Sequence, residues 1–230
     1  MPRSATTPHI VRLPPNGGGA LSPPEGGPPT EEPAQSLQAL AEQAAGCTAC
    51  PLHRLGTQTV FGEGPVHAPL MLVGEQPGDH EDLQGRPFVG PAGQLLERAL
   101  AQLQWPREKL YVTNAVKHFK YEWRGTRRMH KTPAQRELMA CNPWLQQEIA
   151  LVQPQALVAL GATAARAVMG ATVGVLEHRG RWLKRPHDGL PVLVTLHPSA
   201  LLRYRGSDRE AQLRLWLDDL RQAAGYLTAD

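Results

Sequence analysis

Four short apolar runs alternate with segments of helical character, and this alternation restricts the possible folds of the chain more than any other feature. The apolar runs are residues 70–73, 110–113, 156–160 and 191–196, and helical segments are expected at 36–46, 92–104 and 161–169. Helices that connect successive strands place those strands in parallel. The sequence therefore predicts a three-layer α/β/α fold with a mostly parallel, four-stranded central sheet.

Two further helices are predicted from capping patterns. Thr132, followed by a proline and then by Gln135, matches a capping box, so a helix is expected to begin there. Pro143 is expected to interrupt this helix, because proline lacks the amide hydrogen that an interior helical residue donates. Ser207 and Glu210 form a second capping pattern, which predicts a last helix that reaches about residue 224.

The first 35 residues differ in composition from the rest of the chain. They contain 9 of the 22 prolines and five glycines, without any hydrophobic periodicity. Such a composition is typical of disordered segments. We therefore expect a disordered tail at 1–35 and a single folded domain at 36–230.

The whole chain of 230 residues is 41% hydrophobic and 20% charged, as expected of a globular protein. Its apolar runs are shorter than the ~18–20 residues that cross a bilayer. Its N-terminus does not show the basic and apolar regions of a secretory signal. We expect a cytoplasmic, nucleoid-associated monomer that makes no contact with membranes.

Basic residues gather in one short segment, where they meet a single acid, Glu122. They are Lys117, Lys120, Arg124, Arg127, Arg128 and Lys131. The net charge of the whole chain is only +3, so this local run is the stronger indication of a nucleic-acid partner. A solvated surface loop explains the same run, and that alternative stays open.

Polar and aromatic residues follow the predicted strands at the edge of the sheet where ligands bind. Glu75, Asn114 and His197 each come after a strand, and Phe88 lies in the glycine-rich loop after the first one. A carboxylate, an amide, an aromatic ring and a histidine are what a pocket for a flipped base needs. Each residue also has a simpler explanation: Phe88 as a core residue, Asn114 as a turn cap and His197 as a loop histidine.

Three motifs together resemble a known family. The segments GEQPGDHEDLQGRPFVGPAGQLL, TNAVK and HPS occur in the order found in the family-4 uracil-DNA glycosylases. The resemblance covers residues 36–225. It implies a uracil-DNA glycosylase fold and an enzyme that excises uracil from single- or double-stranded DNA.

Two features are similar to the UdgX subgroup of that family, whose members cross-link to uracil-containing DNA through a histidine. Gln76 replaces the alanine that is usual in family-4 enzymes, and a basic segment ends in His130. The loop of that subgroup typically reads KRRIH. Thr126 and Met129 differ from this pattern, whereas both arginines and the histidine match it.

The resemblance implies a role for each residue of the motifs. Asn114 is expected to bind the edge of uracil, Phe88 to stack on its ring, and His197 to stabilise the uracil anion by a hydrogen bond. The further residues expected to line the pocket are Gln76, Pro77, Gly78, Asp79 and Ser199.

The same resemblance assigns the chemistry to the basic segment. His130 is expected to attack C1′ of the sugar, a role open to a neutral imidazole beside a base. Glu75 is expected to orient His130 and to stabilise the charge that develops. Arg127 and Arg128 are expected to hold the segment against DNA phosphates.

The three cysteines, an odd number, indicate a metal site or catalysis rather than disulfides. Cys47 and Cys50 have the spacing of a shared metal centre. The resemblance implies a 4Fe–4S cluster completed by Cys141 and by His118, which stands where the family has a cysteine; imidazole binds cluster iron in Rieske centres. Zinc suits the same ligands, and three unrelated buried thiols are the simplest alternative.

Two alternative functions stay open. A conventional family-4 enzyme releases uracil and leaves free abasic DNA. A non-catalytic DNA-binding module with a Cys/His metal site also accounts for the basic segment. It does not account for Glu75, Asn114 and His197 at successive strand ends.

Overall fold

The computed structural model describes Ile10–Val11 and residues 36–228. The tail predicted at 1–35 therefore lies outside the described residues, apart from Ile10–Val11, which form a short strand. Within these ranges, no helix combines the length and apolar character needed to cross a membrane.

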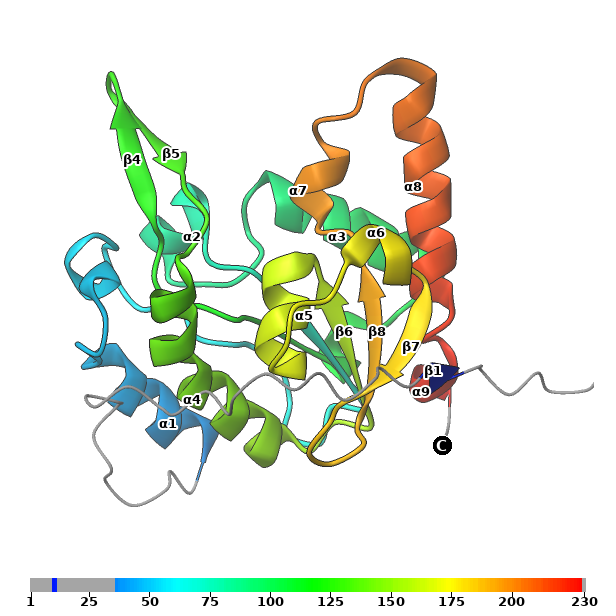
Figure 1. The fold of residues 1–230 in the computed structure, drawn as a ribbon, viewed down its shortest axis with the longest axis horizontal. Coiled ribbons are helices and arrows are strands. Elements are labelled where there is room, and N and C mark those ends of the chain that lie inside the picture. The colour runs from blue at the N-terminus through cyan, green and yellow to red at the C-terminus, as the bar shows by residue number, and fades with distance from the viewer. Residues whose placement is uncertain (1–9, 12–35, 229–230) are drawn as a thin grey trace, which may run out of the picture.

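The central sheet has six strands in the order β1–β7–β8–β6–β2–β3. They are β1 (Ile10–Val11), β2 (Leu70–Gly74), β3 (Leu110–Asn114), β6 (Ala156–Leu160), β7 (Arg181–Lys184) and β8 (Pro191–Thr195). Neighbouring strands are parallel except for β7 and β8, which are antiparallel. The four predicted strands are confirmed, and they lie side by side as β8–β6–β2–β3 (Figure 1).

The predicted number of four strands was too low, because β7 and β1 carry weak sequence signals. Strand β7 has two apolar residues, Trp182 and Leu183, between two charged ones, which is too short a run to mark a strand. Strand β1 has only two residues and lies in the proline- and glycine-rich segment.

Helices cover both faces of the sheet. They are α1 (Leu37–Ala45), η1 (Pro51–Arg54), α2 (Asp79–Gln84), α3 (Pro91–Leu103), η2 (Arg107–Lys109), α4 (Gln135–Val152), α5 (Ala162–Met169), α6 (Val175–His178), α7 (Pro198–Leu201), α8 (Gly206–Arg221) and α9 (Gly225–Thr228). Side chains alternate between the faces along each strand. Met71 and Val73 pack with α1, α4 and α5, whereas Leu70 and Leu72 pack with α3 and α8. The predicted three-layer fold is therefore confirmed.

Helix α4 differs from its prediction at both of the expected landmarks. It begins at Gln135, and the backbone N–H of Ala134 donates to the Glu137 carboxylate at 2.6 Å. Pro143 lies within the helix instead of interrupting it. Burial of Trp144 and Leu145 stabilises the continuous helix by about 3–6 kcal/mol, which offsets the ~3 kcal/mol cost of an interior proline.

The basic segment, expected to be a loop, forms a β-hairpin of β4 (Tyr121–Arg124) and β5 (Arg127–His130). Gly125 and Thr126 make the two-residue turn, and Gly125 has a φ of 60°. A positive φ at the first turn residue favours glycine and matches the twist of a hairpin. The hairpin projects from the end of the molecule at which β6 and β8 end (Figure 1).

Candidate active site

The carboxyl ends of β2, β3 and β8 bring three of the predicted polar residues to one edge of the sheet. Gly74, the last residue of β2, pairs in register with Asn114 at the end of β3, and Glu75 follows Gly74 directly. His197 follows β8 and caps α7. The topology therefore places Glu75, Asn114 and His197 where a ligand of a parallel sheet binds.

The Phe88 ring lies against the end of β2, where Gly74 makes room for the ring and Gly93 makes room for the Phe88 backbone. A Cβ atom on Gly93 would lie 1.7 Å from the Phe88 carbonyl oxygen, and one on Gly74 would lie 2.6 Å from its Cζ atom. Phe88 has a φ of 58°, a conformation uncommon for a residue with a side chain. The ring also packs in the core beside α3, so it is fixed before any ligand binds.

Asn114 and His197 approach the same phenylalanine. A Cβ atom on Gly74 would lie 2.3 Å from Asn114 Oδ1, so the absence of a side chain at Gly74 leaves room for both Asn114 and Phe88. The rings of Phe88 and His197 are stacked, with centroids 6.2 Å apart and an interplanar angle of 29°. An aromatic face, an amide and an imidazole thus converge.

His197 is held in one orientation by Ser199. The Ser199 backbone N–H donates to His197 Nδ1 at 3.2 Å, and the Ser199 hydroxyl lies 2.8 Å from the same nitrogen. Since Nδ1 accepts a hydrogen bond, the proton of the neutral ring is on Nε2. Burial lowers the pKa of His197 to about 4. Ser199, expected to line the pocket, therefore sets the orientation and tautomer of its donor.

Glu75 lies between His130 and Thr163. Its Oε1 atom is 3.2 Å from His130 Nε2, and its Oε2 atom accepts a hydrogen bond from the Thr163 hydroxyl at 2.5 Å. Burial alone raises the pKa of Glu75, but the hydrogen bonds from His130 and Thr163 outweigh burial and bring that pKa below its ordinary value. Glu75 is therefore an ionised carboxylate in contact with the imidazole of the hairpin.

The Gln76 amide, which was expected to line the pocket, is hydrogen-bonded to both ends of the hairpin. Its Nε2 atom donates to the carbonyl oxygens of Lys120 at 3.1 Å and Lys131 at 3.2 Å, and its Oε1 atom accepts from the Lys120 N–H at 3.1 Å. Lys120 precedes β4 and Lys131 follows β5. Gln76 thus holds together the base of the hairpin that carries His130.

Arg128 also has a different place from the one predicted, which was a contact with DNA phosphate. Its guanidinium donates to Asp79 and to Asp82, each at 2.6 Å, and it stacks over the rings of Phe119 and Tyr121. Asp82 is completely buried. These carboxylates neutralise Arg128 inside the protein, whereas Arg127 is exposed and free to meet a phosphate.

The loop residues Pro77, Gly78 and Asp79 are likewise used inside the protein. Pro77 is buried. The Gly78 N–H donates to the Glu81 carboxylate at 3.1 Å, and Asp79 is the partner of Arg128. These contacts position α2 and the hairpin, and the expectation that backbone groups of this loop line the pocket stays a prediction.

The four predicted metal ligands line one cavity between α1, α4 and the end of β3. The lining of this small cavity includes Cys47, Cys50, His118 and Cys141. Among the described residues, three or more ligand side chains do not converge on a single ion. A four-iron cluster does not need this convergence, because each of its ligands binds a different iron.

Two of the cysteine sulfurs already accept hydrogen bonds. The Trp144 indole N–H donates to Cys47 Sγ and the Lys117 backbone N–H to Cys141 Sγ, both at 3.2 Å. Burial raises the pKa of the Cys141 thiol to about 12. Hydrogen bonds to ligand sulfur are a feature of protein-bound iron–sulfur clusters, so the donor set and its surroundings fit such a group.

Residues 61–221 match the family described as the uracil DNA glycosylase superfamily, which is well over half of the chain. The chain belongs to this superfamily. The matched range contains Glu75, Asn114, His130 and His197, so the whole candidate pocket lies within it.

Individual relatives of this superfamily member are similar over most of their length. The type-4 uracil-DNA glycosylase of Thermotoga maritima is 37% identical over 195 residues, which cover 83% of this chain and 94% of the relative. The type-4 enzyme of Pyrobaculum aerophilum is 38% identical over 173 residues, covering 73% and 85%. The type-5 uracil-DNA glycosylase of the same organism is 32% identical over 177 residues, covering 67% and 74%.

Sequence reasoning missed the buried polar residues that support the site of this superfamily member. Lys117, assigned to the basic surface run, is 1% exposed and forms an ion pair with the fully buried Glu148. Its ammonium also donates to the Asn114 carbonyl oxygen at 2.7 Å, which fixes the backbone at the end of β3. Lys117 follows an apolar valine, and Glu148 lies on an apolar face of its helix. Charged residues in apolar surroundings are usually paired, so this pattern is the signal that could have predicted the ion pair.

Proposed function

We propose that this protein excises uracil from DNA and then binds the sugar covalently through His130. The observation that carries the proposal is the contact between His130 Nε2 and Glu75 Oε1, 3.2 Å apart, beside the convergent Phe88, Asn114 and His197. The similarity to type-4 uracil-DNA glycosylases supports the substrate. The Gln76 clamp on the hairpin supports the role of His130.

The pocket provides for departure of the base. Uracil stacks on Phe88, and the Asn114 amide binds its polar edge. When the bond between C1′ and N1 breaks, the electron pair leaves with uracil, so negative charge develops on the base and positive charge on the sugar. The neutral His197 donates its Nε2–H to the uracil oxygen, and the ionised Glu75 stabilises the cationic sugar.

Covalent capture follows from the state of His130. Because Nε2 lies next to a carboxylate oxygen, it carries the proton, and Nδ1 carries the lone pair. The Nδ1 lone pair forms a bond to C1′, and the Nε2 proton passes to Glu75. The adduct is then a neutral N-glycosyl imidazole, and uracil takes up a proton from solvent.

The proposal is tested with two single-stranded oligonucleotides that differ in one base, uracil or thymine. We expect a protein–DNA species that survives denaturing electrophoresis and heating with uracil and not with thymine, together with release of free uracil. Release of uracil without a stable adduct would leave the glycosylase activity and overturn covalent capture. If neither free uracil nor the adduct forms, both parts of the proposal are overturned.

A hydrolytic glycosylase is the second candidate. His130 is 48% exposed and Glu75 is 22% exposed, so water can reach the carboxylate. In that case Glu75 activates a water molecule, and free abasic DNA accumulates at the rate at which uracil appears.

We further propose that Cys47, Cys50, His118 and Cys141 hold a 4Fe–4S cluster. When bound, the cluster joins α1 and the loop after it to α4 and to the end of β3. Two groups of the protein would hold the ligand sulfurs in place: the Trp144 indole donates to Cys47 Sγ and the Lys117 backbone N–H to Cys141 Sγ. Equal amounts of iron and acid-labile sulfide in the purified protein are expected, and stoichiometric zinc without iron would contradict the proposal.

A further inference from the structure

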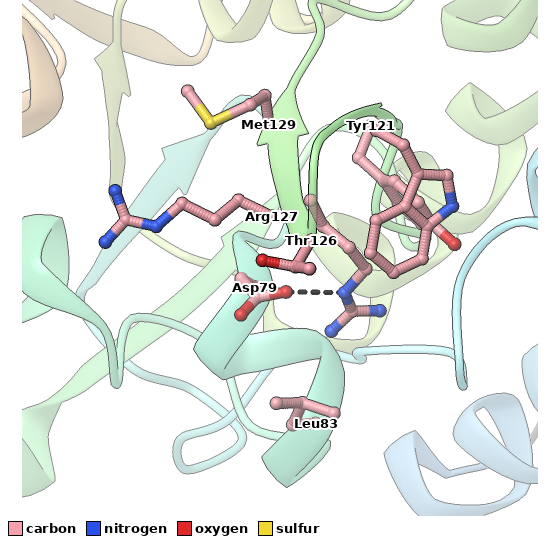
Figure 2. Close-up of a pocket in the computed structure, with 8 residues that line it drawn as sticks. Asp79, Leu83, Tyr121, Thr126, Arg127 and Met129 are labelled. Atoms are coloured by element: carbon pink, nitrogen blue, oxygen red, sulfur yellow. Dashed lines mark hydrogen bonds and ion pairs between the residues drawn. The ribbon is translucent and has the colours of Figure 1, made fainter.

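Beside the hairpin lies a groove whose lining does not include Glu75, Phe88, Asn114 or His197. It lies between β4, β5 and α2 and has a volume of about 540 Å³, and we call it the hairpin groove. It is lined by Asp79, Leu83, Tyr121, Trp123, Thr126, Arg127, Arg128 and Met129 (Figure 2). Three of its apolar side chains are exposed to solvent: Leu83, Trp123 and Met129. This size is within the range of sites that bind small organic groups.

Trp123 is the unusual residue of the hairpin groove. It is 63% exposed, whereas the other four tryptophans of the chain lie in the interior. Its indole contacts the Tyr121 ring edge to face, with centroids 5.6 Å apart and an interplanar angle of 89°. Tyr121 is in turn stacked against the Arg128 guanidinium at 5.1 Å. The indole is therefore supported on one side and open to solvent on the other.

The charge of the groove favours a polyanion. Arg124 and Arg127 are exposed at the end of the hairpin. The acid in the lining, Asp79, is paired with Arg128 at 2.6 Å, so it does not oppose an approaching phosphate. The register puts Arg124 and Arg127 on the face of the hairpin opposite Trp123, where they can contact the phosphates of a strand that passes the end of the hairpin. Proteins bind unpaired nucleotides by base stacking on aromatic rings together with phosphate contacts. A protein partner with an apolar face has no need of the arginines.

The register of the hairpin sets the distance to the active site. Tyr121 is opposite His130, and Trp123 is opposite Arg128, two residues further along the strands. Two residues of a strand span about 7 Å. Stacked nucleotides of one DNA strand rise about 3.4 Å each, and an unpaired strand can be more extended. A strand whose uridine reaches His130 therefore brings a nucleotide one or two positions away to the level of Trp123.

We propose that the hairpin groove binds an unpaired nucleotide that flanks the uridine, with its base stacked on Trp123. The assignment rests on the proposed function for the position of the uridine. It specifies the substrate as single-stranded DNA, because a base that is paired in a duplex does not expose a face to the indole.

The first test measures binding of labelled oligothymidylate, which contains no uracil and needs no catalysis. Trp123→Ala should weaken binding about five- to 150-fold, the loss expected for one stacked base, while Trp123→Phe should retain part of it. Leu176→Ala is the control, because Leu176 is 78% exposed on α6, outside the hairpin groove. The affinity of Trp123→Ala for a fully paired duplex should fall much less.

Three results would overturn the proposal. The first is an unchanged affinity of Trp123→Ala for oligothymidylate, and the second is an equal loss for single strand and duplex. The third is concentration-dependent self-association of the wild type that Trp123→Ala abolishes without any effect on DNA, which would assign the groove to a protein contact.

A second measurement separates this proposal from the proposed function. With a uracil-containing single strand, Trp123→Ala should raise KM by more than it lowers kcat. If the wild type releases no uracil and still binds oligothymidylate through Trp123, the proposed function fails and the hairpin groove stands. If uracil is released and Trp123→Ala leaves KM unchanged, the hairpin groove fails and the proposed function stands.

Discussion

Replacing Arg128 with methionine tests whether a buried ion pair holds His130 in the active site. Methionine retains an apolar contact with Phe119 and Tyr121 but leaves Asp82, which is completely buried, without its cation. Asp82 then retains the hydrogen bonds from Thr57 at 2.7 and 2.8 Å. Removing one partner of a buried pair costs about 3–5 kcal/mol, whereas the loss at the partly exposed Asp79 adds about 0.2–1 kcal/mol.

This cost can be relieved by separation of the hairpin from α2, which lets water reach Asp82. Since 1.4 kcal/mol is a factor of ten, the equilibrium constant for docking of the hairpin should fall by about 10²–10⁴. The rate of adduct formation, followed on a denaturing gel, should fall with it, because His130 leaves Glu75. Uracil release should fall less, because Phe88, Asn114 and His197 are not on the hairpin.

Arg127→Met is the matched control, because Arg127 is adjacent, exposed and outside the two ion pairs of Arg128. It should leave adduct formation at saturating DNA nearly unchanged. The slope of log affinity against log salt should become shallower by about 0.7–0.9 if Arg127 contacts one phosphate. Equal adduct rates for Arg128→Met and the wild type would refute the reasoning that the ion pairs position the hairpin.

Further predictions concern the clamp, the buried histidine and the cluster. Gln76→Ala removes three hydrogen bonds to the hairpin, which contribute about 0.5–1.5 kcal/mol each. Single-turnover assays should therefore show slower adduct formation, with uracil release retained. An unchanged rate of adduct formation would contradict the role of Gln76 in holding the hairpin. In the folded protein the pKa of His197 is lowered from its ordinary 6.5 to about 4. Between these two pH values His197 is protonated in the unfolded chain but not in the folded protein. The free energy of unfolding should therefore decrease as pH falls from 6.5 to 4. The decrease is at most about 3 kcal/mol, measured as urea midpoints against His197→Asn, in which this component is absent. Cys141→Ser should abolish the bound iron, and iron retained at the wild-type level would contradict the role of Cys141 as a ligand.

The sequence predicts most of the fold because the strong signals are local. Apolar runs such as 156–160 are buried on both faces of the sheet, and the structure begins and ends strand β6 at those residues. The predicted start of α4 was too early, because the Glu137 carboxylate caps the helix at Ala134. The predicted interruption at Pro143 was wrong, because burial of Trp144 and Leu145 outweighs the cost of an interior proline. Strand β7 was missed because it depends on pairing with β8.

The candidate site is predictable where topology alone brings residues together. Glu75, Asn114 and His197 follow parallel strands, so their approach can be expected from strand order. The partners of Gln76 and Arg128 cannot, because they depend on how the hairpin packs against α2. A basic residue in a basic run suggests phosphate, yet the buried Asp82 takes up the Arg128 charge, and nothing in local sequence distinguishes Arg128 from Arg127.

The most direct test of the central claim is a paired measurement on His130→Ser, with a uracil-containing single strand as substrate. The heat-stable adduct is quantified on a denaturing gel, and abasic sites are quantified by alkaline cleavage. Phe88, Asn114 and His197 remain, and water can occupy the space of the imidazole next to Glu75. We predict that the adduct disappears while uracil release continues and abasic DNA accumulates. Full adduct formation by His130→Ser would show that another residue is the nucleophile and would contradict the account.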